Sequence, residues 1–304
     1  MPCTAAARFT RNVAASAPIV DARSRFPGTG FHALVITSGN ANALTGDIGD
    51  FRKVVMRQHQ GIVNTLVAMR MMRGDFAKDP AVTFDGKSAI DTSKGFYRGD
   101  SQGGIFGTTY MAVTTDVTRG LVSVPGAPYS LLLNRSADFG PFFTLARGAY
   151  ETGMDLQMLL AIVQMLWDRT EPGGYASYLT SNPLPGTPEH QLLVHVGLGD
   201  HQVTPLGAEW IARTVGAKTI APQTRPIWGV DEIASPYSGK AAIVEFDYGL
   251  PDAPKTNLPP SGYPDPHEWV RRTPEAYTQA DIFFRTGVFQ QTCTGKCALP
   301  QPTN

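Results

Sequence analysis

Hydrophobic positions repeat with a helical period in several segments of this chain. Residues 51–73 place apolar side chains three and four positions apart and stop before Gly74, which predicts one long amphipathic helix. The same period predicts three later helices, over 154–168, about 205–215 and about 274–286. Short continuous apolar runs predict four buried strands, over 31–37, 120–126, 191–198 and 241–247. Because strands alternate with helices, we expect an α/β fold with a mostly parallel sheet and helices on both faces.

The segment 154–168 is apolar on most sides of its helix, so it is either deeply buried or part of a cap over a pocket. We expect a helical insertion over about 135–185 that acts as this cap. Large apolar side chains in the insertion favour a substrate with an apolar acyl or alcohol group. The side chains expected to line the pocket are Phe142, Phe143, Met154 and Trp167.

The segment Gly99-Asp100-Ser101-Gln102-Gly103 matches the pattern G-x-S-x-G. A predicted strand precedes it and a predicted helix follows, so Ser101 is a candidate nucleophile on a strained turn. We expect side chains larger than glycine at 99 and 103 to collide with the neighbouring backbone. The Gln102 amide is a candidate oxyanion donor, and Asp100 would flank the substrate. The pentapeptide alone also occurs in ordinary glycine-rich turns.

A serine nucleophile needs a base to take its proton and an acid to orient that base. Asp200 follows the strand 191–198 and begins an Asp-x-x-Val-x-Pro pattern, which is typical of such an acid loop. His267 lies in a polar loop before the last predicted helix. The order of Ser101, Asp200 and His267 along the chain is that of the α/β-hydrolases.

Several residues offer alternatives to these assignments. Asp247 and Asp252 are alternative acids, and His267 is alternatively a plain surface-loop residue. His201 adjoins the candidate acid and is a candidate pocket residue. His195 lies in the middle of a predicted strand, which favours a structural role.

Charge and composition exclude several classes of protein. Lys plus Arg and Asp plus Glu number 26 each, so no net field would attract nucleic acid or anionic lipid. No apolar run reaches the ~20 residues that a membrane-spanning helix needs, and no signal peptide is evident. We therefore expect the chain as written to be soluble and cytoplasmic, although the localisation stays open. The triad of Ser101, Asp200 and His267 would require no metal or organic cofactor.

Cysteine usage leaves one question open. Cys293 and Cys297 lie close together near the carboxyl terminus, where a small disulfide loop and two free thiols are equally plausible. A zinc half-site is disfavoured because no second Cys or His pair accompanies them.

Five stretches carry a resemblance over about residues 60 to 287. In order they are Met69 to Gly74, Gly99 to Gly104, Trp167-Asp168-Arg169-Thr170-Glu171-Pro172, Gly199 to Pro205 and Asp265-Pro266-His267. With them the chain resembles the carboxy-terminal half of a large, usually secreted family of bacterial α/β-hydrolases. The resemblance implies hydrolysis of a small-molecule ester or amide.

The first fifty residues resemble a different family. The stretches Ala7 to Asn12, Ala17 to Val20 and Ser38 to Gly46 are similar to the amino-terminal segment of the ornithine/glutamate N-acetyltransferases of arginine biosynthesis. Enzymes of that family cleave themselves at an Ala-Thr-Met-type junction to free a threonine nucleophile. This chain contains no such junction, so we assign the segment no activity.

The two resemblances divide the chain into an acetyltransferase-like segment (1–50), a hydrolase core (51–290) and a tail (291–304). This hydrolase-type sheet would lack some of its early strands and the usual His-Gly-Gly source of a second oxyanion donor. In one hypothesis Gly39, after the strand 31–37, supplies that donor; in the other, the segment only covers an exposed sheet edge. An impaired hydrolase without a full oxyanion hole is therefore an alternative, and the oligomeric state stays open.

Overall fold

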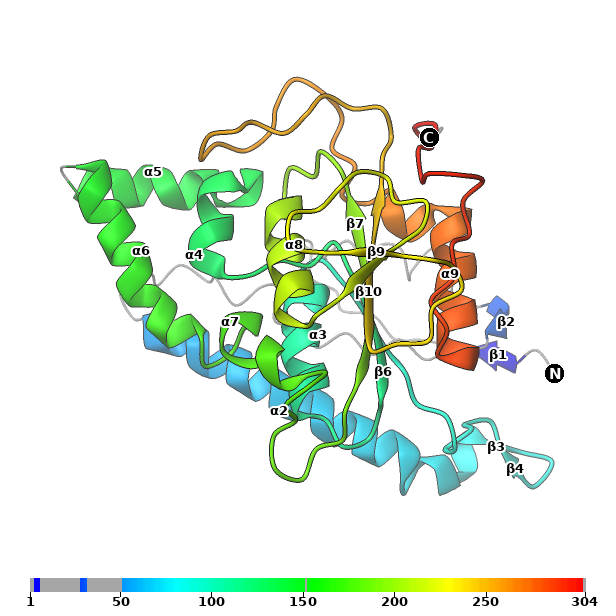
Figure 1. Cartoon of the computed structure of the whole chain (residues 1–304). Coiled ribbons are helices and arrows are strands. Elements are labelled where there is room, and N and C mark those ends of the chain that lie inside the picture. The colour runs from blue at the N-terminus through cyan, green and yellow to red at the C-terminus, as the bar shows by residue number, and fades with distance from the viewer. Residues whose placement is uncertain (1–2, 6–27, 32–50, 151, 303–304) are drawn as a thin grey trace.

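The computed structural model describes residues 3–5, 28–31, 51–150 and 152–302, and its centre is a six-stranded sheet (Figure 1). Every pair of neighbouring strands in this sheet is parallel. The spatial order is β5 (Tyr97–Asp100), β6 (Arg119–Ser123), β7 (Gln191–Gly197), β10 (Ala241–Phe246), β8 (Lys218–Ile220) and β9 (Glu232–Ile233). The predicted α/β fold is therefore confirmed.

The two central strands, β7 and β10, are continuous apolar runs because both of their faces are covered. All six residues of β10 are buried, and so are six of the seven residues of β7. Such runs are typical of parallel sheets with helices on both sides. In the described part of the chain β5 forms one edge of this sheet.

Helices cover both faces, as expected. On one face α3 (Gln102–Val113) and α8 (Pro205–Thr214) pack onto the strands, and on the other face lies α9 (Pro274–Thr286). The first core includes Tyr110, Met111, Ile211, Leu192 and Ile243, and the second includes Phe283, Ala280, Leu193, Val244 and Phe246.

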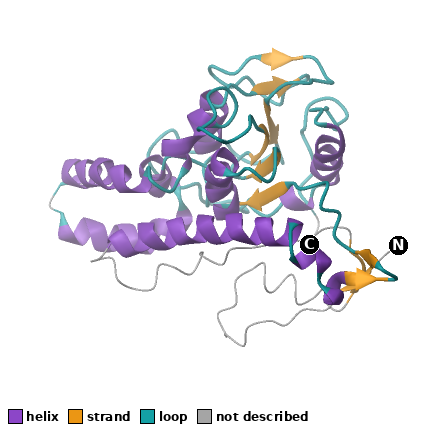
Figure 2. Ribbon diagram, turned by 90° about the horizontal axis from the view of Figure 1, so that it is seen from below, coloured by secondary structure: helices purple, strands orange, loops and turns teal. Residues whose placement is uncertain are grey.

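The long helix α2 (Phe51–Arg73) has the predicted ends and crosses below the sheet in the views of Figures 1 and 2. It packs against α3 and against α6 (Gly153–Trp167). Its buried side includes Val54, Val55 and Gln58. Two short 3-10 turns follow, η3 (Phe76–Lys78) and η4 (Pro80–Val82), and then a small hairpin of β3 (Thr83–Phe84) and β4 (Lys87–Ser88).

Between β6 and β7 the chain forms a run of helices, of which α5 and α6 extend away from the sheet (Figure 1). Leu156, Leu160 and Trp167 on α6 pack in a third apolar cluster with Ile105 of α3. The elements are α4 (Tyr129–Leu132), η5 (Leu133–Arg135), η6 (Ala137–Phe139), α5 (Gly140–Ala149), α6 (Gly153–Trp167), α7 (Pro172–Tyr175) and η7 (Ala176–Tyr178).

The predicted helices α6, α8 and α9 agree with the structure to within a residue or so, but the strands differ more. β6 ends at Ser123 rather than at 126, and β8 and β9 were not predicted. With three and two residues, β8 and β9 are too short to show a period. Of the predicted strand 31–37 only Phe31 is described, as the end of β2 (Gly28–Phe31), which pairs antiparallel with β1 (Cys3–Ala5). Gly39 lies outside the described residues.

The carboxy-terminal tail answers the cysteine question. After η8 (Val270–Arg272) and α9, the chain returns to the sheet, and Cys293 and Cys297 form a disulfide. The Asp247 amide, just after β10, donates to the Cys297 carbonyl at 2.8 Å. The described residues contain no cluster of His, Cys, Asp and Glu that would hold a metal ion. None of the described helices is long and apolar enough to span a membrane.

Candidate active site

Ser101 lies on a sharp turn between β5 and α3. Its backbone has φ 60° and ψ −126°, a conformation that costs free energy in a residue with a side chain. The Ser101 amide donates to the carbonyl of Ser123, at the end of the neighbouring strand, at 2.9 Å. The turn therefore holds Ser101 at the carboxyl edge of the sheet, where ligands of open parallel sheets bind.

Steric constraints require glycine at only one of the two positions that flank the nucleophile, 99 and 103. A Cβ atom on Gly99 would lie 2.1 Å from the carbonyl oxygen of Gly103, so a larger residue is excluded there. A Cβ atom on Gly103 would meet nothing within 4 Å. The expected collision is thus correct for Gly99 and wrong for Gly103. Gly103 takes part in the close contact through its backbone carbonyl, and the space next to its own Cα is open.

Asp200 lies in the loop between β7 and α8. Its Oδ1 atom accepts from the backbone amides of Gln202 at 2.8 Å and Val203 at 2.9 Å, so the carboxylate is oriented by its own loop. Pro205 then begins α8, as the sequence pattern indicated. The side chain of Val203 packs in the apolar cluster around α4.

His267 is the partner of Asp200. Its Nδ1 donates to Asp200 Oδ2 at 2.7 Å, and both residues are only 1% exposed. Burial lowers the pKa of His267, but the hydrogen bond and negative charge of Asp200 outweigh it, so the pKa is raised overall. This arrangement fixes the tautomer in which Nε2 is free to accept a proton. Of the candidate acids, Asp247 instead accepts from the Gly249 amide, at 2.8 Å.

Asp265 ties the acid loop to the histidine loop, a role that the sequence analysis missed. Its Oδ1 accepts from the amides of His201 and His267, each at 3.1 Å. Its Oδ2 accepts from the Gln202 side chain at 2.8 Å. The only available signal was its position two residues before the candidate base, where Asp often forms a local turn.

The structure brings Asp200 and His267 into contact but forms no hydrogen bond between them and Ser101 in the described residues. Ser101 and Asp200 follow β5 and β7, which are separated by the single strand β6. The end of β6 contacts both neighbours: the Ser123 carbonyl accepts from the Ser101 amide at 2.9 Å. The amide of the next residue, Val124, donates to the His195 carbonyl of β7 at 2.7 Å. Catalytic hydrogen bonds are often long or absent until substrate is bound.

The residues expected to line a pocket lie in different surroundings. Phe143 and Trp167 are buried in the third apolar cluster and Phe142 is half-buried, whereas Met154 on α6 is 73% exposed. The ring of His201 packs edge-on against Tyr263, with ring centroids 4.7 Å apart.

Asp100 is half-buried beside the nucleophile turn. One of its oxygens lies 3.7 Å from Nε of Arg98, and the other, Oδ1, has no hydrogen-bond partner among the described residues. Because this Oδ1 atom is buried, the place of Asp100 next to a substrate stays a prediction.

The helices between β6 and β7 also bring a carboxyl group towards His267. Asp138 lies in η6, and the amide of its neighbour Ala137 donates to the His201 carbonyl at 2.8 Å. Burial raises the pKa of Asp138, the nearby His267 lowers it, and Asp265 and Asp200 raise it, so that it is raised overall. Asp138 could not be identified from the sequence, because nothing in its local pattern distinguishes it from a surface residue.

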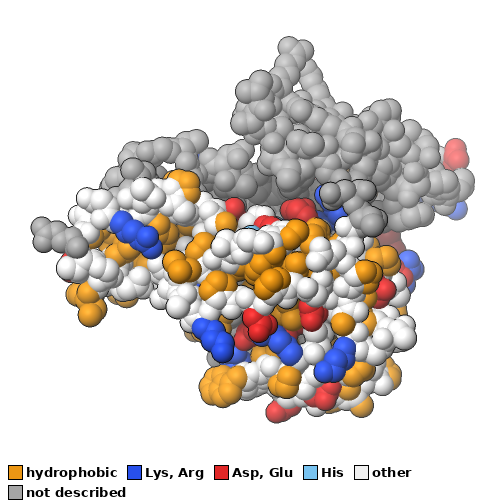
Figure 3. Space-filling model, turned by 90° about the horizontal axis from the view of Figure 1, so that it is seen from above, with side chains coloured by type: hydrophobic (Ala, Val, Ile, Leu, Met, Phe, Trp, Pro, Cys, Tyr) orange, Lys and Arg blue, Asp and Glu red, His pale blue; other side chains and the backbone are white. Residues whose placement is uncertain are grey.

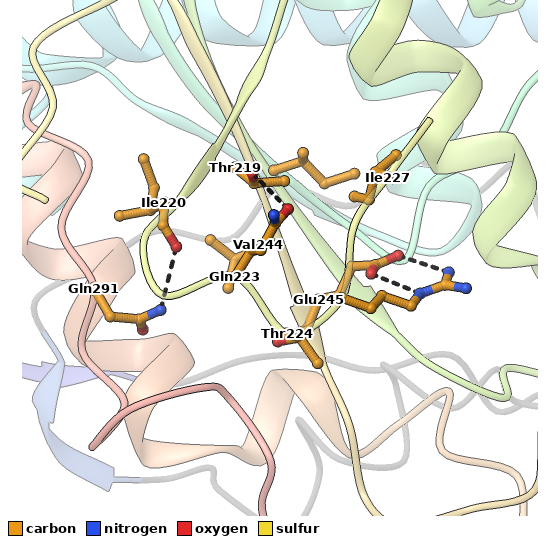
Figure 4. A pocket seen from close by; sticks show the side chains of 10 residues that line it. Thr219, Ile220, Gln223, Thr224, Ile227, Val244, Glu245 and Gln291 are labelled. Carbon is orange, nitrogen blue, oxygen red and sulfur yellow. Dashed lines mark hydrogen bonds and ion pairs between the residues drawn. The ribbon is translucent and has the colours of Figure 1, made fainter. Parts of the chain in front are cut away.

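Away from this edge, the buried Glu245 of β10 borders a small cavity (Figure 4). Arg225 donates to both carboxylate oxygens of Glu245, at 2.8 and 2.9 Å. The cavity has a volume of about 10 Å³, close to what one water molecule needs. Ser101, Asp200 and His267 do not line it, so it is separate from the candidate active site.

The face of the molecule drawn in Figure 3 agrees with the balanced charge. Seen from above, hydrophobic, acidic and basic side chains are mixed, and no large field of one charge is visible on this face (Figure 3). His195, as expected, is a core residue: its Nε2 hydrogen-bonds Gln279 Oε1 at 2.8 Å, and burial lowers its pKa to about 3.

Comparison with known proteins gives one finding. The sequence profile of the ArgJ family matches residues 1–68, which supports the resemblance of the amino-terminal segment to the ornithine/glutamate N-acetyltransferases and extends it into α2. No curated protein and no solved structure shows a significant match to this chain. The match covers less than a quarter of the 304 residues and ends before Ser101.

Proposed function

We propose that this chain is a serine hydrolase of the carboxylesterase type, which cleaves an ester or amide with apolar groups through an acyl-enzyme on Ser101. The observation that carries the proposal is the buried hydrogen bond between Asp200 and His267, at the sheet edge where Ser101 occupies its strained turn. An acid–base pair and a serine that converge on one edge from separate strands are typical of acyl-transfer sites.

Each group has a defined role in the proposed reaction. His267 Nε2 takes the proton of Ser101 as the hydroxyl oxygen attacks the substrate carbonyl carbon. Asp200 holds the Nδ1–H tautomer and stabilises the imidazolium that forms. The imidazolium then protonates the leaving group as the carbonyl re-forms, which leaves an acyl-enzyme. His267 next deprotonates a water molecule, which attacks the acyl-enzyme and frees Ser101.

The oxyanion of this reaction would be held by the Gln102 amide, which lies in the first turn of α3 where helix amides have no carbonyl partner within the helix. Gly39 stays a hypothesis for the second donor. The alternative is a hydrolase impaired by the lack of that donor, since losing one donor costs on the order of 10²–10³ in rate.

The test is hydrolysis of a short-chain chromogenic ester by the purified chain, beside a Ser101→Ala variant and with labelling by a fluorophosphonate. Hydrolysis and labelling that both vanish in the variant support the proposal. Labelling with little turnover favours the impaired hydrolase. A folded wild type that neither turns over nor labels would rule out an activated serine.

The ArgJ match favours a second candidate, an ornithine/glutamate N-acetyltransferase activity. The absence of an Ala-Thr-Met-type junction counts against it, because the family nucleophile arises there by self-cleavage. Transfer of an acetyl group from N-acetylornithine to glutamate, measured by mass spectrometry, tests it directly. Transfer that persists in Ser101→Ala, with a chain shorter than 32.8 kDa on a gel, would favour this candidate over the hydrolase.

A further inference from the structure

A polar cluster of half-buried and buried side chains joins the end of α6 to α4. The Gln164 side-chain amide donates to Asp168 Oδ1 at 2.7 Å and to Glu171 Oε1 at 2.5 Å. The carbonyl oxygen of the same side chain accepts from the Ser130 amide at 2.9 Å. One glutamine thus bridges two carboxyl groups and the first turn of α4.

Glu171 is the most buried member of this cluster, with 0% of its surface exposed. The backbone amides of Gly173 and Tyr129 also lie against its carboxyl group. A Cβ atom on Gly173 would lie 2.4 Å from Glu171 Oε1, so only glycine permits this close approach. Glu171 Oε2 has no hydrogen-bond partner among the described residues. Such a fully buried acid with a free oxygen is costly, which indicates a role beyond packing.

Tyr129 connects this acid with the residue that follows the nucleophile. Its ring packs on Trp167, with centroids 5.2 Å apart, and on Phe106, with centroids 6.2 Å apart. Its buried hydroxyl lies beside the Gln102 side chain without forming a well-aligned hydrogen bond. The backbone of Tyr129 therefore contacts Glu171, while its hydroxyl faces Gln102.

We propose that Glu171 is a positioning residue, which acts through Tyr129 to hold Gln102 with its amide directed at the oxyanion of the reaction. The inference rests on the proposed serine hydrolase function. Glu171 fixes the backbone of Tyr129, the aromatic neighbours fix its ring, and the hydroxyl limits the movement of the Gln102 side chain. Because Gln102 begins α3 directly after Ser101, packing against its side chain restrains the backbone that carries its amide.

The protonation state of Glu171 gives this role a pH signature. Burial and the charge of Asp168 raise its pKa, and Gln164 with the Gly173 and Tyr129 amides lowers it, which leaves the pKa at about 8. The groups that face Glu171 are Asp168 and Gln164, at the end of α6, and Tyr129 of α4. Burial raises the pKa of Tyr129, so that its hydroxyl stays neutral. Glu171 is thus protonated at pH 7, and ionisation at higher pH would place a second negative charge beside Asp168.

The experiment compares Glu171→Ala, Glu171→Gln and Tyr129→Phe with the wild type between pH 6 and 9.5. Active sites are counted with a fluorophosphonate so that kcat refers to folded protein. We expect Glu171→Ala to lower kcat about tenfold with KM unchanged, less than the 10²–10³ that loss of a donor costs. Glu171→Gln mimics the protonated acid, so we expect it to restore kcat and to remove an alkaline decline with a midpoint near pH 8 in the wild type.

Glu245→Gln is the matched control, since it changes another buried carboxyl group, which lies on β10 away from Gln102, and it should keep the wild-type pH profile. Unchanged kcat and pH profile in the Glu171 variants of an active enzyme would overturn the positioning role alone. If Glu171→Ala does not fold, the other two variants decide. The positioning role is overturned if Tyr129→Phe keeps the wild-type kcat and Glu171→Gln keeps the alkaline decline of the wild type. If the wild type shows no Ser101-dependent labelling, the proposed function fails, and the inference fails with it.

Discussion

Asp200 and Glu245 are both buried carboxylates associated with adjacent central strands, but their surroundings differ. Glu245 lies within β10 and is held by Arg225, which also binds Glu209 at 2.7 Å. Asp200 lies in the loop after β7, where two amides and His267 surround it. Arginine keeps its charge at any ordinary pH, whereas histidine exchanges a proton near neutrality. Glu245, paired with an arginine within a strand, thus forms a structural ion pair. Asp200, paired with a histidine after the end of a strand, forms a pair suited to catalysis.

The largest effect we expect comes from Asp200→Asn, which keeps the shape of the side chain and removes the charge. Without the carboxylate His267 can adopt the wrong tautomer, so kcat for the ester should fall by on the order of 10⁴. Asp252→Asn, in an exposed loop, is the control and should keep wild-type kcat. A large loss in Asp252→Asn instead would assign the acid to that residue.

Arg225→Met tests the structural side of the comparison. It leaves the Glu245 carboxylate buried without its cation, so the free energy of unfolding at pH 8 should fall by about 3 kcal/mol in urea titrations. Burial already raises the pKa of Glu245 and Arg225 opposes this, so the variant raises that pKa further. The loss of stability in Arg225→Met is therefore present when the pH lies above the pKa of Glu245 in the folded protein. It shrinks as the pH falls through that pKa and Glu245 becomes protonated.

The control for this variant is Lys218→Met, at an exposed ion pair with Asp231, for which we expect almost no change in the free energy of unfolding, because water screens the two charges. Ester turnover per folded molecule should stay unchanged in Arg225→Met. A selective loss of turnover would contradict the separation of the two carboxylates.

The disulfide provides a smaller test of the same separation, because the Cys293–Cys297 loop binds the end of β10 through the Asp247 amide. Replacing both cysteines by serine should lower the free energy of unfolding by about 2 kcal/mol, the loop-closure contribution of so short a ring. The esterase rate at 25 °C should not change. Equal stability of the wild type with and without reductant would show that the loop contributes nothing.

The smallest expected effect is a shift in the acid limb of the pH profile. His267 must be neutral to accept the Ser101 proton, and Asp200 raises the pKa of His267 above the ordinary 6.5. The acid limb of kcat/KM should therefore have its midpoint above pH 6.5, and below that midpoint kcat/KM should fall tenfold per pH unit. In Asp200→Asn only burial remains as a strong influence, so the residual activity should show a midpoint at lower pH. A midpoint that does not move would mean that another group titrates.

Helix ends were the part of the fold that could be predicted best from sequence. α2 ends before Gly74, the Thr152 side chain accepts from the Asp155 amide at the start of α6, and Gly287 ends α9 with a positive φ of 76°. These signals are local, since caps and glycines act on the backbone within one turn. β8 and β9 gave no such signal, because their pairing depends on strands far away in the chain.

The amino-acid sequence by itself determined the α/β class, the helix boundaries and the order of Ser101, Asp200 and His267, because these follow from local periods and motifs. Only the tertiary structure decided that Asp200 rather than Asp247 contacts His267, that Asp265 joins the two loops and that Glu171 is buried behind Gln102. Each of these contacts joins segments that lie apart along the chain or depends on how the chain folds around a side chain. Burial and distance, which set pKa values and partners, exist only once the sheet is assembled.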